Sequence, residues 1–310
     1  MMRNLFALIL LCASVVSQAK ENITIIYAYN IADSVANYHR ALTIEANAIQ
    51  DKYLFIFDAR PGAGGSIASN YVLNTPNTIL AHSTAFFIRP NVYPKESYDL
   101  SSFKELFNHC TASMAVTSVK YKSWKDVPAK TVTVGISGLG VTTHLAALQL
   151  QKNLPNMDII PFKSTTDSMF SMIGANTDFH IGFISEAEQW TKKNKSAVNK
   201  GAVNILGITG TKAVSGYPTL VSAGFPQAFS QMDVGHHLVI PVGRFSDEKA
   251  RELYDIFGKA AKSKSVRDAY AVDFCNPAET PYSELQNWYS FHTEYWKKLS
   301  TGIDLESASK

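Results

Sequence analysis

The sequence lacks three features that mark particular classes of protein. No run of five or more like charges occurs and the formal net charge is only +3, which is too small to indicate a nucleic-acid-binding surface. No apolar stretch reaches the ~20 residues that span a bilayer, and no internal repeat of the solenoid kind is present. What remains is a chain of 310 residues, 46% of them apolar, which is long enough for two domains of roughly 100–150 residues each.

The sequence also lacks the common motifs of hydrolases, nucleotide-binding proteins and metalloenzymes. Gly135-Ile136-Ser137-Gly138-Leu139 has leucine where the nucleophile elbow requires its closing glycine. Gly138-Leu139-Gly140 does not extend to the dinucleotide motif, because position 143 is threonine, and no Walker lysine follows. His236 and His237 are adjacent, so they cannot easily face one metal ion from a single helix or strand. We therefore expect no catalytic residue, no metal and no cofactor.

The N-terminus has the pattern of a cleaved secretory signal peptide. Arg3 is followed by an apolar stretch at 5–16, and 17–19 supplies small residues of the kind that a signal peptidase reads. A stretch of this length is well short of a membrane anchor. We expect residues 1–19 to be removed and the mature protein to be periplasmic.

The first part of the mature chain predicts an α/β unit. Apolar runs at 23–27, 53–57 and 78–81 are typical of buried strands, and helical spacing is present at 34–49 and 67–73. This β-α-β-α-β order predicts a mostly parallel sheet with helices on its faces.

A second α/β unit is predicted in the middle of the chain, and a helical segment at the end. Strands of the second unit are predicted at 131–135, 157–162, 179–183 and 202–208, and its helices at 144–151 and 167–173. Helices are predicted at 247–262, 265–270 and 282–298. The β-prone stretches 115–119 and 237–242 would be the two crossovers of a hinge. The prediction is a discontinuous first domain of residues 20–115 plus 243–310 and a second domain of residues 116–242.

Three loops lie at the carboxyl ends of predicted strands, where open parallel sheets bind ligands. They are Tyr29–Asp33, Ser83-Thr84 and Ser137–Thr143. In the third loop two glycines allow close backbone approach and two threonines add hydroxyl donors, which favours an anion site. An ordinary tight turn before a capped helix explains the same residues equally well. His144, at the start of that helix, either orients a ligand or simply packs.

Several short motifs, taken together, resemble a known family. They are Arg-Pro-Gly-Ala-Gly-Gly-Ser at 60–66, Asn-Val-Tyr-Pro at 91–94, Gly-Leu-Gly-Val-Thr-Thr-His-Leu-Ala at 138–146, Pro-Phe-Lys at 161–163 and Pro-Thr-Leu at 218–220 leading to Ala-Gly-Phe-Pro at 223–226. Their order and spacing resemble those of the extracytoplasmic receptors of tripartite tricarboxylate transporters, the Bug family. The resemblance covers nearly the whole mature chain.

This resemblance implies a type II periplasmic-binding-protein fold, in which two α/β domains joined by a two-strand hinge close on a dicarboxylate, tricarboxylate or related acid. It also implies membrane subunits of a secondary transporter as partners, and a monomer. The small net charge predicts no nucleic-acid partner. The chain departs from the family at 29–33, where Asn30 replaces part of a glycine-rich stretch and Asp33 matches an acidic position. It departs again at Ser164-Thr165-Thr166, where hydroxyls replace small residues.

Loops and resemblance together give one set of expected ligand-binding residues. They are Tyr29, Asn30, Asp33, Ser83, Thr84, Ser137, Gly138, Gly140, Thr142, Thr143, His144, Ser164 and Thr165. Two other functions stay open: a sensor module without a transporter, and an exported hydrolase that uses Ser137 and His144. The sequence leaves undecided whether Cys110 and Cys275 are joined, because their separation in space is unknown.

Overall fold

The chain is described from a computed structural model that covers residues 19–32, 35–95, 98–193 and 203–305. The expected signal peptide, apart from Ala19, lies outside the described residues. No helix in the described part of the chain is both long and apolar enough to cross a membrane.

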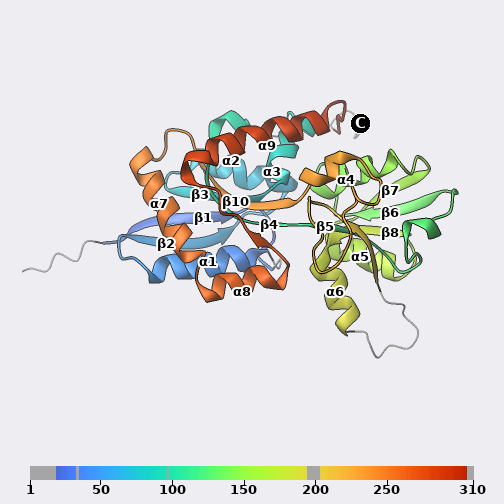
Figure 1. Cartoon of the computed structure of the whole chain (residues 1–310). Coiled ribbons are helices and arrows are strands. Elements are labelled where there is room, and N and C mark those ends of the chain that lie inside the picture. Colours follow the sequence, from blue (N-terminus) through green and yellow to red (C-terminus); the bar gives the residue numbers. More distant parts are fainter. Residues whose placement is uncertain (1–18, 33–34, 96–97, 194–202, 306–310) are drawn as a thin grey trace, which may run out of the picture.

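Two β-sheets organise the molecule (Figure 1). The first sheet has the strand order β11-β4-β10-β3-β1-β2. Its strands are β1 (Glu21–Tyr27), β2 (Tyr53–Ala59), β3 (Thr78–Ser83), β4 (Phe103–Ala112), β10 (Val234–Pro241) and β11 (Asn276–Pro277). The second sheet has the order β7-β6-β8-β5-β9. Its strands are β5 (Met114–Ser118), β6 (Val132–Ile136), β7 (Met157–Pro161), β8 (Phe179–Phe183) and β9 (Asn204–Ile208). We call the parts built around these sheets the first and the second domain.

Both sheets are mixed, whereas the sequence predicted a mostly parallel sheet for the first unit. In the first sheet β1 is parallel to β2 and β3, but β10 is antiparallel to β3 and β4. In the second sheet β6 is parallel to β7 and β8, while β5 is antiparallel to β8 and β9. The antiparallel strands β4, β5 and β10 are those next to the passages between the domains. The apolar pattern of a sequence indicates that a strand is buried, but it does not indicate whether the strand runs parallel or antiparallel to its neighbours.

The chain passes between the domains at two places. Ser113 alone separates β4 of the first sheet from β5 of the second. The return passage ends at Val234, where β10 begins. The stretches 115–119 and 237–242 were expected to be the crossovers themselves; instead they fall mostly within β5 and β10, which pair fully into their sheets.

Helices cover both faces of each sheet (Figure 1). In the first domain they are α1 (Ala36–Ala48), α2 (Ser66–Asn74), α3 (Ala85–Val92), α7 (Asp247–Ala260), α8 (Lys264–Val272) and α9 (Leu285–Ser300). In the second domain they are α4 (Thr142–Gln151), α5 (Thr165–Ile173) and α6 (Ile184–Lys193). Helix α1 packs with α7 and α8, and α3 packs with α9. The C-terminal helices, whose formation the apolar spacing predicted, therefore pack on the first domain.

Strand β4 and helix α3 were not predicted, and each has a local reason. Glu105, Asn108 and His109 of β4 are buried although they are polar, so the strand shows no apolar alternation. Helix α3 contains Pro90, a residue that normally ends a helical prediction. Both elements depend on neighbours that are distant in the sequence.

Candidate functional site

A cleft of about 630 Å³ lies between the two domains. It opens at the carboxyl ends of β1 and β3 in the first sheet and of β6, β7 and β8 in the second. This is where parallel strands direct their following loops and helix N-termini. Its lining comes from separate segments that the folded chain brings together, so the cleft is the candidate functional site.

Most of the residues expected to bind a ligand line this cleft. Those that do are Tyr29, Asn30, Ser83, Ser137, Thr142, Thr143, Ser164 and Thr165. Asp33 lies outside the described residues. Thr84, Gly138, Gly140 and His144 are absent from the described lining. Contact of any of these side chains with a ligand stays a prediction.

The residues outside the lining support the cleft through their own packing. The Thr84 hydroxyl accepts a hydrogen bond from the N–H of Gly235 at 2.7 Å. The Nδ1 atom of His144 accepts one from the N–H of Gly140 at 3.2 Å. At Gly140, where φ is +71°, an added Cβ would lie 2.7 Å from the ring of Tyr93. These residues fix the shape of two loops, which is the packing role that the sequence left open for His144.

Helix α4 places two hydroxyls at the wall of the cleft. The helix begins at Thr142, two residues before the predicted start, so Thr142 and Thr143 belong to its first turn. The first N–H groups of a helix have no partner within it. The Oγ1 atom of Thr143 lies 2.9 Å from the Oγ of Ser137, and it accepts a hydrogen bond from the backbone N–H of Ser137 at 3.3 Å. Donors therefore gather at this wall of the second domain.

In the first domain, the side chains of Tyr29, Ser83 and His82 form a hydrogen-bonded group at the cleft. The Tyr29 hydroxyl lies 2.8 Å from the Oγ of Ser83 and 3.1 Å from Nδ1 of His82. Burial, and secondarily the nearby His237, lowers the pKa of His82 to about 3, so its ring is neutral near pH 7. Tyr29 and Ser83 are thus oriented without adding charge to the cleft.

The turn at 62–65 also lines the cleft, and the prediction did not include it. Gly65 has φ +99°, and an added Cβ would lie 2.1 Å from Nε2 of His82. Only glycine fits such a position, because both the backbone angle and the close approach exclude a side chain. The Gly-Ala-Gly-Gly sequence was the signal that marked this turn.

Three charged residues line the cleft in the described part of the chain, and none of them belongs to the predicted ligand-binding set. They are Lys163, Glu186 and Asp273. Burial alone would raise the pKa of Glu186, but hydrogen bonds from His180 and from the N–H of Phe183 outweigh it and lower this pKa. The carboxylate of Glu186 is therefore ionised at neutral pH.

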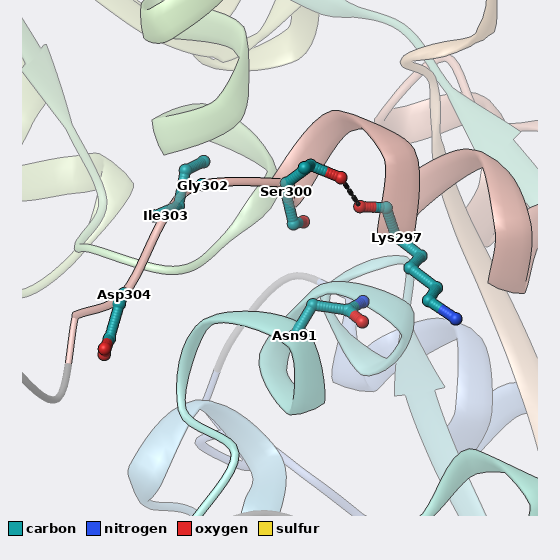
Figure 2. Close-up of a pocket in the computed structure, with 7 residues that line it drawn as sticks. Asn91, Lys297, Ser300, Gly302, Ile303 and Asp304 are labelled. Atoms are coloured by element: carbon teal, nitrogen blue, oxygen red, sulfur yellow. Dashed lines mark hydrogen bonds between the residues drawn. The ribbon is translucent and has the colours of Figure 1, made fainter.

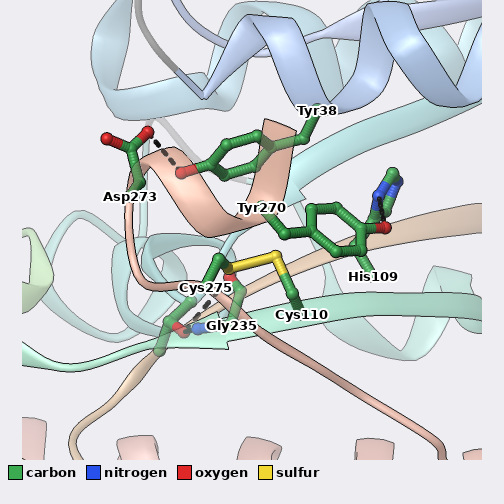
Figure 3. The surroundings of a disulfide bond; sticks show 8 residues. Tyr38, His109, Cys110, Gly235, Tyr270, Asp273 and Cys275 are labelled. Carbon is green, nitrogen blue, oxygen red and sulfur yellow. Dashed lines mark hydrogen bonds between the residues drawn. A yellow bond between two sulfur atoms is a disulfide. The ribbon is translucent and has the colours of Figure 1, made fainter. Parts of the chain in front are cut away.

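Asp273 is held at the cleft by a disulfide and a tyrosine (Figure 3). The sulfur atoms of Cys110 and Cys275 are bonded, which joins β4 to the segment that follows α8. The Tyr38 hydroxyl of α1 donates to a carboxylate oxygen of Asp273. Sequence reasoning could not find this residue, because nothing near Asp273 in the chain indicates that it faces a site.

A smaller hollow of about 310 Å³ lies beside the end of α9 (Figure 2). Asn91, Lys297, Ser300 and Asp304 are among its lining residues, and the Thr301 hydroxyl donates to the Lys297 carbonyl at 3.1 Å. It lies at the surface of the first domain and does not include the strand-end loops. The interdomain cleft is therefore the better candidate.

No protein-family model and no curated protein matches the chain. Solved structures do resemble it. A TctC solute-binding protein from Polaromonas aligns over 90% of this chain and 97% of its own, with a TM-score of 0.71 and 19% identity. A Rhodopseudomonas palustris protein with adipate aligns over 90% and 96%, with a TM-score of 0.73 and 16% identity. MatC from Rhodopseudomonas palustris with bound malate aligns over 90% and 99%, with a TM-score of 0.73 and 15% identity.

Identities this low establish the fold alone. The chain has the two-domain α/β fold of periplasmic binding proteins, and the predicted type II fold is confirmed. The resemblance to tripartite tricarboxylate receptors that the motifs indicated is confirmed as a likeness of fold.

Proposed function

We propose that this protein, which has the fold of the TctC-type solute-binding proteins, captures a small organic acid in the cleft between its domains. The observation that carries the proposal is the convergence of hydroxyl and backbone donors from both domains on one cleft at the strand ends. Two proteins of this fold hold the carboxylates adipate and malate. Hydrogen bonds to a charged group contribute about 1.5–3 kcal/mol each, so a few of them account for the ~8 kcal/mol of a micromolar complex.

In the proposed mechanism the second domain closes on the ligand about the two passages between the domains. The short connection at Ser113 suits this motion, because hinges are a few residues at the ends of elements. The closed protein then presents the ligand to the membrane subunits of a secondary transporter. An exported location agrees with the Cys110–Cys275 disulfide, since such bonds persist in oxidising compartments. A sensor without a transporter would use the same cleft.

The geometry favours binding over hydrolysis by Ser137 and His144. The Ser137 hydroxyl lies 2.9 Å from Oγ1 of Thr143, while Nδ1 of His144 accepts a hydrogen bond from the Gly140 N–H. His144 is also absent from the described lining of the cleft. A nucleophile needs its base within hydrogen-bond reach, so we propose that the protein is not an enzyme.

A ligand screen by thermal unfolding tests the function. Malate, adipate, citrate, simple monocarboxylates and amino acids are each added to the mature protein from Lys20 onward, with glucose as an uncharged control. We expect at least one acid to raise the melting temperature, increasingly with concentration, because a ligand at a hundredfold its Kd stabilises the folded state by about 2.7 kcal/mol. A flat response to every acid at millimolar concentration would contradict the proposal.

Replacing Thr143 by valine is expected to weaken binding of the acid identified in that screen by about tenfold or more. The change removes a hydroxyl from the cleft wall and preserves the branched shape of the side chain, and a hydrogen bond to a charged group is lost. Isothermal titration calorimetry measures the affinity. Thr293→Val is the matched control, because its hydroxyl bonds to the Tyr289 carbonyl within α9. Equal affinity of Thr143→Val and the control would remove Thr143 from the site.

A further inference from the structure

The charges that line the cleft do not suit a ligand that is purely anionic. In the described lining, Lys163 is the one side chain with a full positive charge, against the carboxylates of Glu186 and Asp273. A dicarboxylate would enter a cleft whose fixed charge repels it, and such repulsion is strong where water is displaced. These charges favour a ligand that carries a positive group as well as a carboxylate.

Glu186 supplies one acceptor on the wall of the second domain. It lies in the first turn of α6, and 21% of its side-chain surface is exposed. Its Oε2 atom accepts from the N–H of Phe183 at 2.9 Å and lies 3.4 Å from Nε2 of His180. These contacts fix the direction of the carboxylate and leave part of it facing the cleft.

Asp273 supplies a second acceptor on the wall of the first domain, at the same end of the cleft. The next residue, Phe274, packs against a buried cluster that includes Ile184, two positions before Glu186. Phe183 in turn packs against the core of the first domain. The two acidic residues thus stand on opposite walls next to one contact between the domains.

His236 is an independent sign that this end of the cleft receives a ligand. Its side chain lines the cleft and is 3% exposed, and neither ring nitrogen has a hydrogen-bond partner among the described residues. Buried polar atoms are normally paired. The Tyr38 ring packs against His236 with 5.4 Å between centroids, and the same tyrosine donates to Asp273. Burial, followed by the nearby His237, lowers the pKa of His236 to about 3, so the neutral ring offers a lone pair to a donor.

We propose that the ligand is an amino carboxylate, whose carboxylate contacts the hydroxyls of Ser83, Ser137 and Thr143 and whose ammonium group faces Asp273, Glu186 and His236. The inference rests on the proposed function and specifies its substrate class. An ammonium group donates three hydrogen bonds and accepts none, which matches a subsite made of acceptors. No three metal-ligating side chains lie close enough together to hold a metal ion in the described chain, so Asp273, Glu186 and His236 would meet one ammonium group only when the two domains close on it.

The test compares acids that differ only in an amino group. Isothermal titration calorimetry is run with succinate against L-aspartate, glutarate against L-glutamate, and butyrate against 4-aminobutyrate. We expect at least one amino acid to bind tenfold or more tightly than its amine-free partner. In Glu186→Gln and Asp273→Asn this ratio is expected to fall at least fivefold, because each amide keeps an acceptor oxygen and loses the charge.

Glu188→Gln is the matched control for the charge change. Glu188 lies on the same helix as Glu186, pairs with Lys192 at 3.2 Å and does not line the described cleft, so the ratio should stay as in the unaltered protein. If succinate, glutarate and butyrate bind as tightly as their amino partners, or if Glu186→Gln and Asp273→Asn leave the ratio unchanged, the ammonium subsite is overturned while the capture of acids stands. If none of the six compounds and none of the acids in the thermal screen binds, both proposals fail.

Discussion

Lowering the pH from 7 to 5 is expected to reduce the free energy of unfolding by an amount on the order of 5 kcal/mol. The cause is a set of histidines buried in the neutral form in the first domain. Burial is the main reason that the pKa values of His82, His236 and His292 fall to about 3. The pKa values of His39 and His109, whose rings lie 4.4 Å apart, are also lowered well below 6.5 by burial.

The direction of the effect follows from proton binding. In the unfolded chain these histidines take up protons near pH 6.5, whereas in the folded protein they do so only at a much lower pH. Below pH 6.5 the unfolded state therefore binds more protons, and each such group costs about 1.4 kcal/mol per pH unit. Glu105 and Asp233 act in the opposite direction, because burial raises their pKa values, and they offset part of the loss.

Urea unfolding at pH 7, 6 and 5 measures this dependence. His292→Phe gives a matched variant, because the ring of His292 packs against Trp288 with 4.0 Å between centroids and phenylalanine preserves an aromatic ring there. The slope of the unfolding free energy against pH is expected to decrease by about one proton in this variant. Equal stability of the unaltered protein at pH 7 and pH 5 would show that the buried histidines do not titrate on unfolding.

Removing the disulfide is expected to cost about 2–5 kcal/mol of stability and to lower the melting temperature by about 10 °C. Cys110 and Cys275 are 165 positions apart, so the bond restricts a long loop of the unfolded chain. It also fixes the segment after α8, whose strand β11 pairs with β4 through only Asn276 and Pro277. Few other contacts of the backbone hold that edge of the sheet.

The measurement compares the oxidised protein, the protein reduced with dithiothreitol, and Cys110→Ala with Cys275→Ala combined. Both cysteines are buried, so alanine avoids placing a new polar group in the core. The reduced protein and the double variant should unfold at similar temperatures, both below the oxidised form. A melting temperature that is unaffected by reduction in the unaltered protein would contradict the stabilising role of the bond.

Local pattern was sufficient for the elements that bury one continuous apolar face. Strands β1 and β2 and helices α1 and α7 follow their apolar spacing closely, because burial of that face is what forms them. Strand β4 escaped prediction because its buried polar side chains find partners elsewhere in the fold: Oε2 of Glu105 lies 3.2 Å from Nδ1 of His237, and Nδ2 of Asn108 donates to Oγ1 of Thr280 at 3.1 Å. Those partners are far along the chain, so no local sequence pattern could predict the strand.

The cleft, too, has features that the local sequence predicts and features that depend on distant contacts. The sequence alone determined the α/β alternation and therefore the loops that follow parallel strands, which is why Ser83, Ser137 and Thr143 were expected at the site and line it. Only the tertiary structure decided the direction of the strands next to the domain passages and the charge of the cleft. Glu186, His236 and Asp273 come from three separate segments that all line the cleft, and this arrangement depends on long-range packing and on the Cys110–Cys275 bond. Neighbouring residues encode local conformation, whereas contacts between distant segments depend on the whole fold.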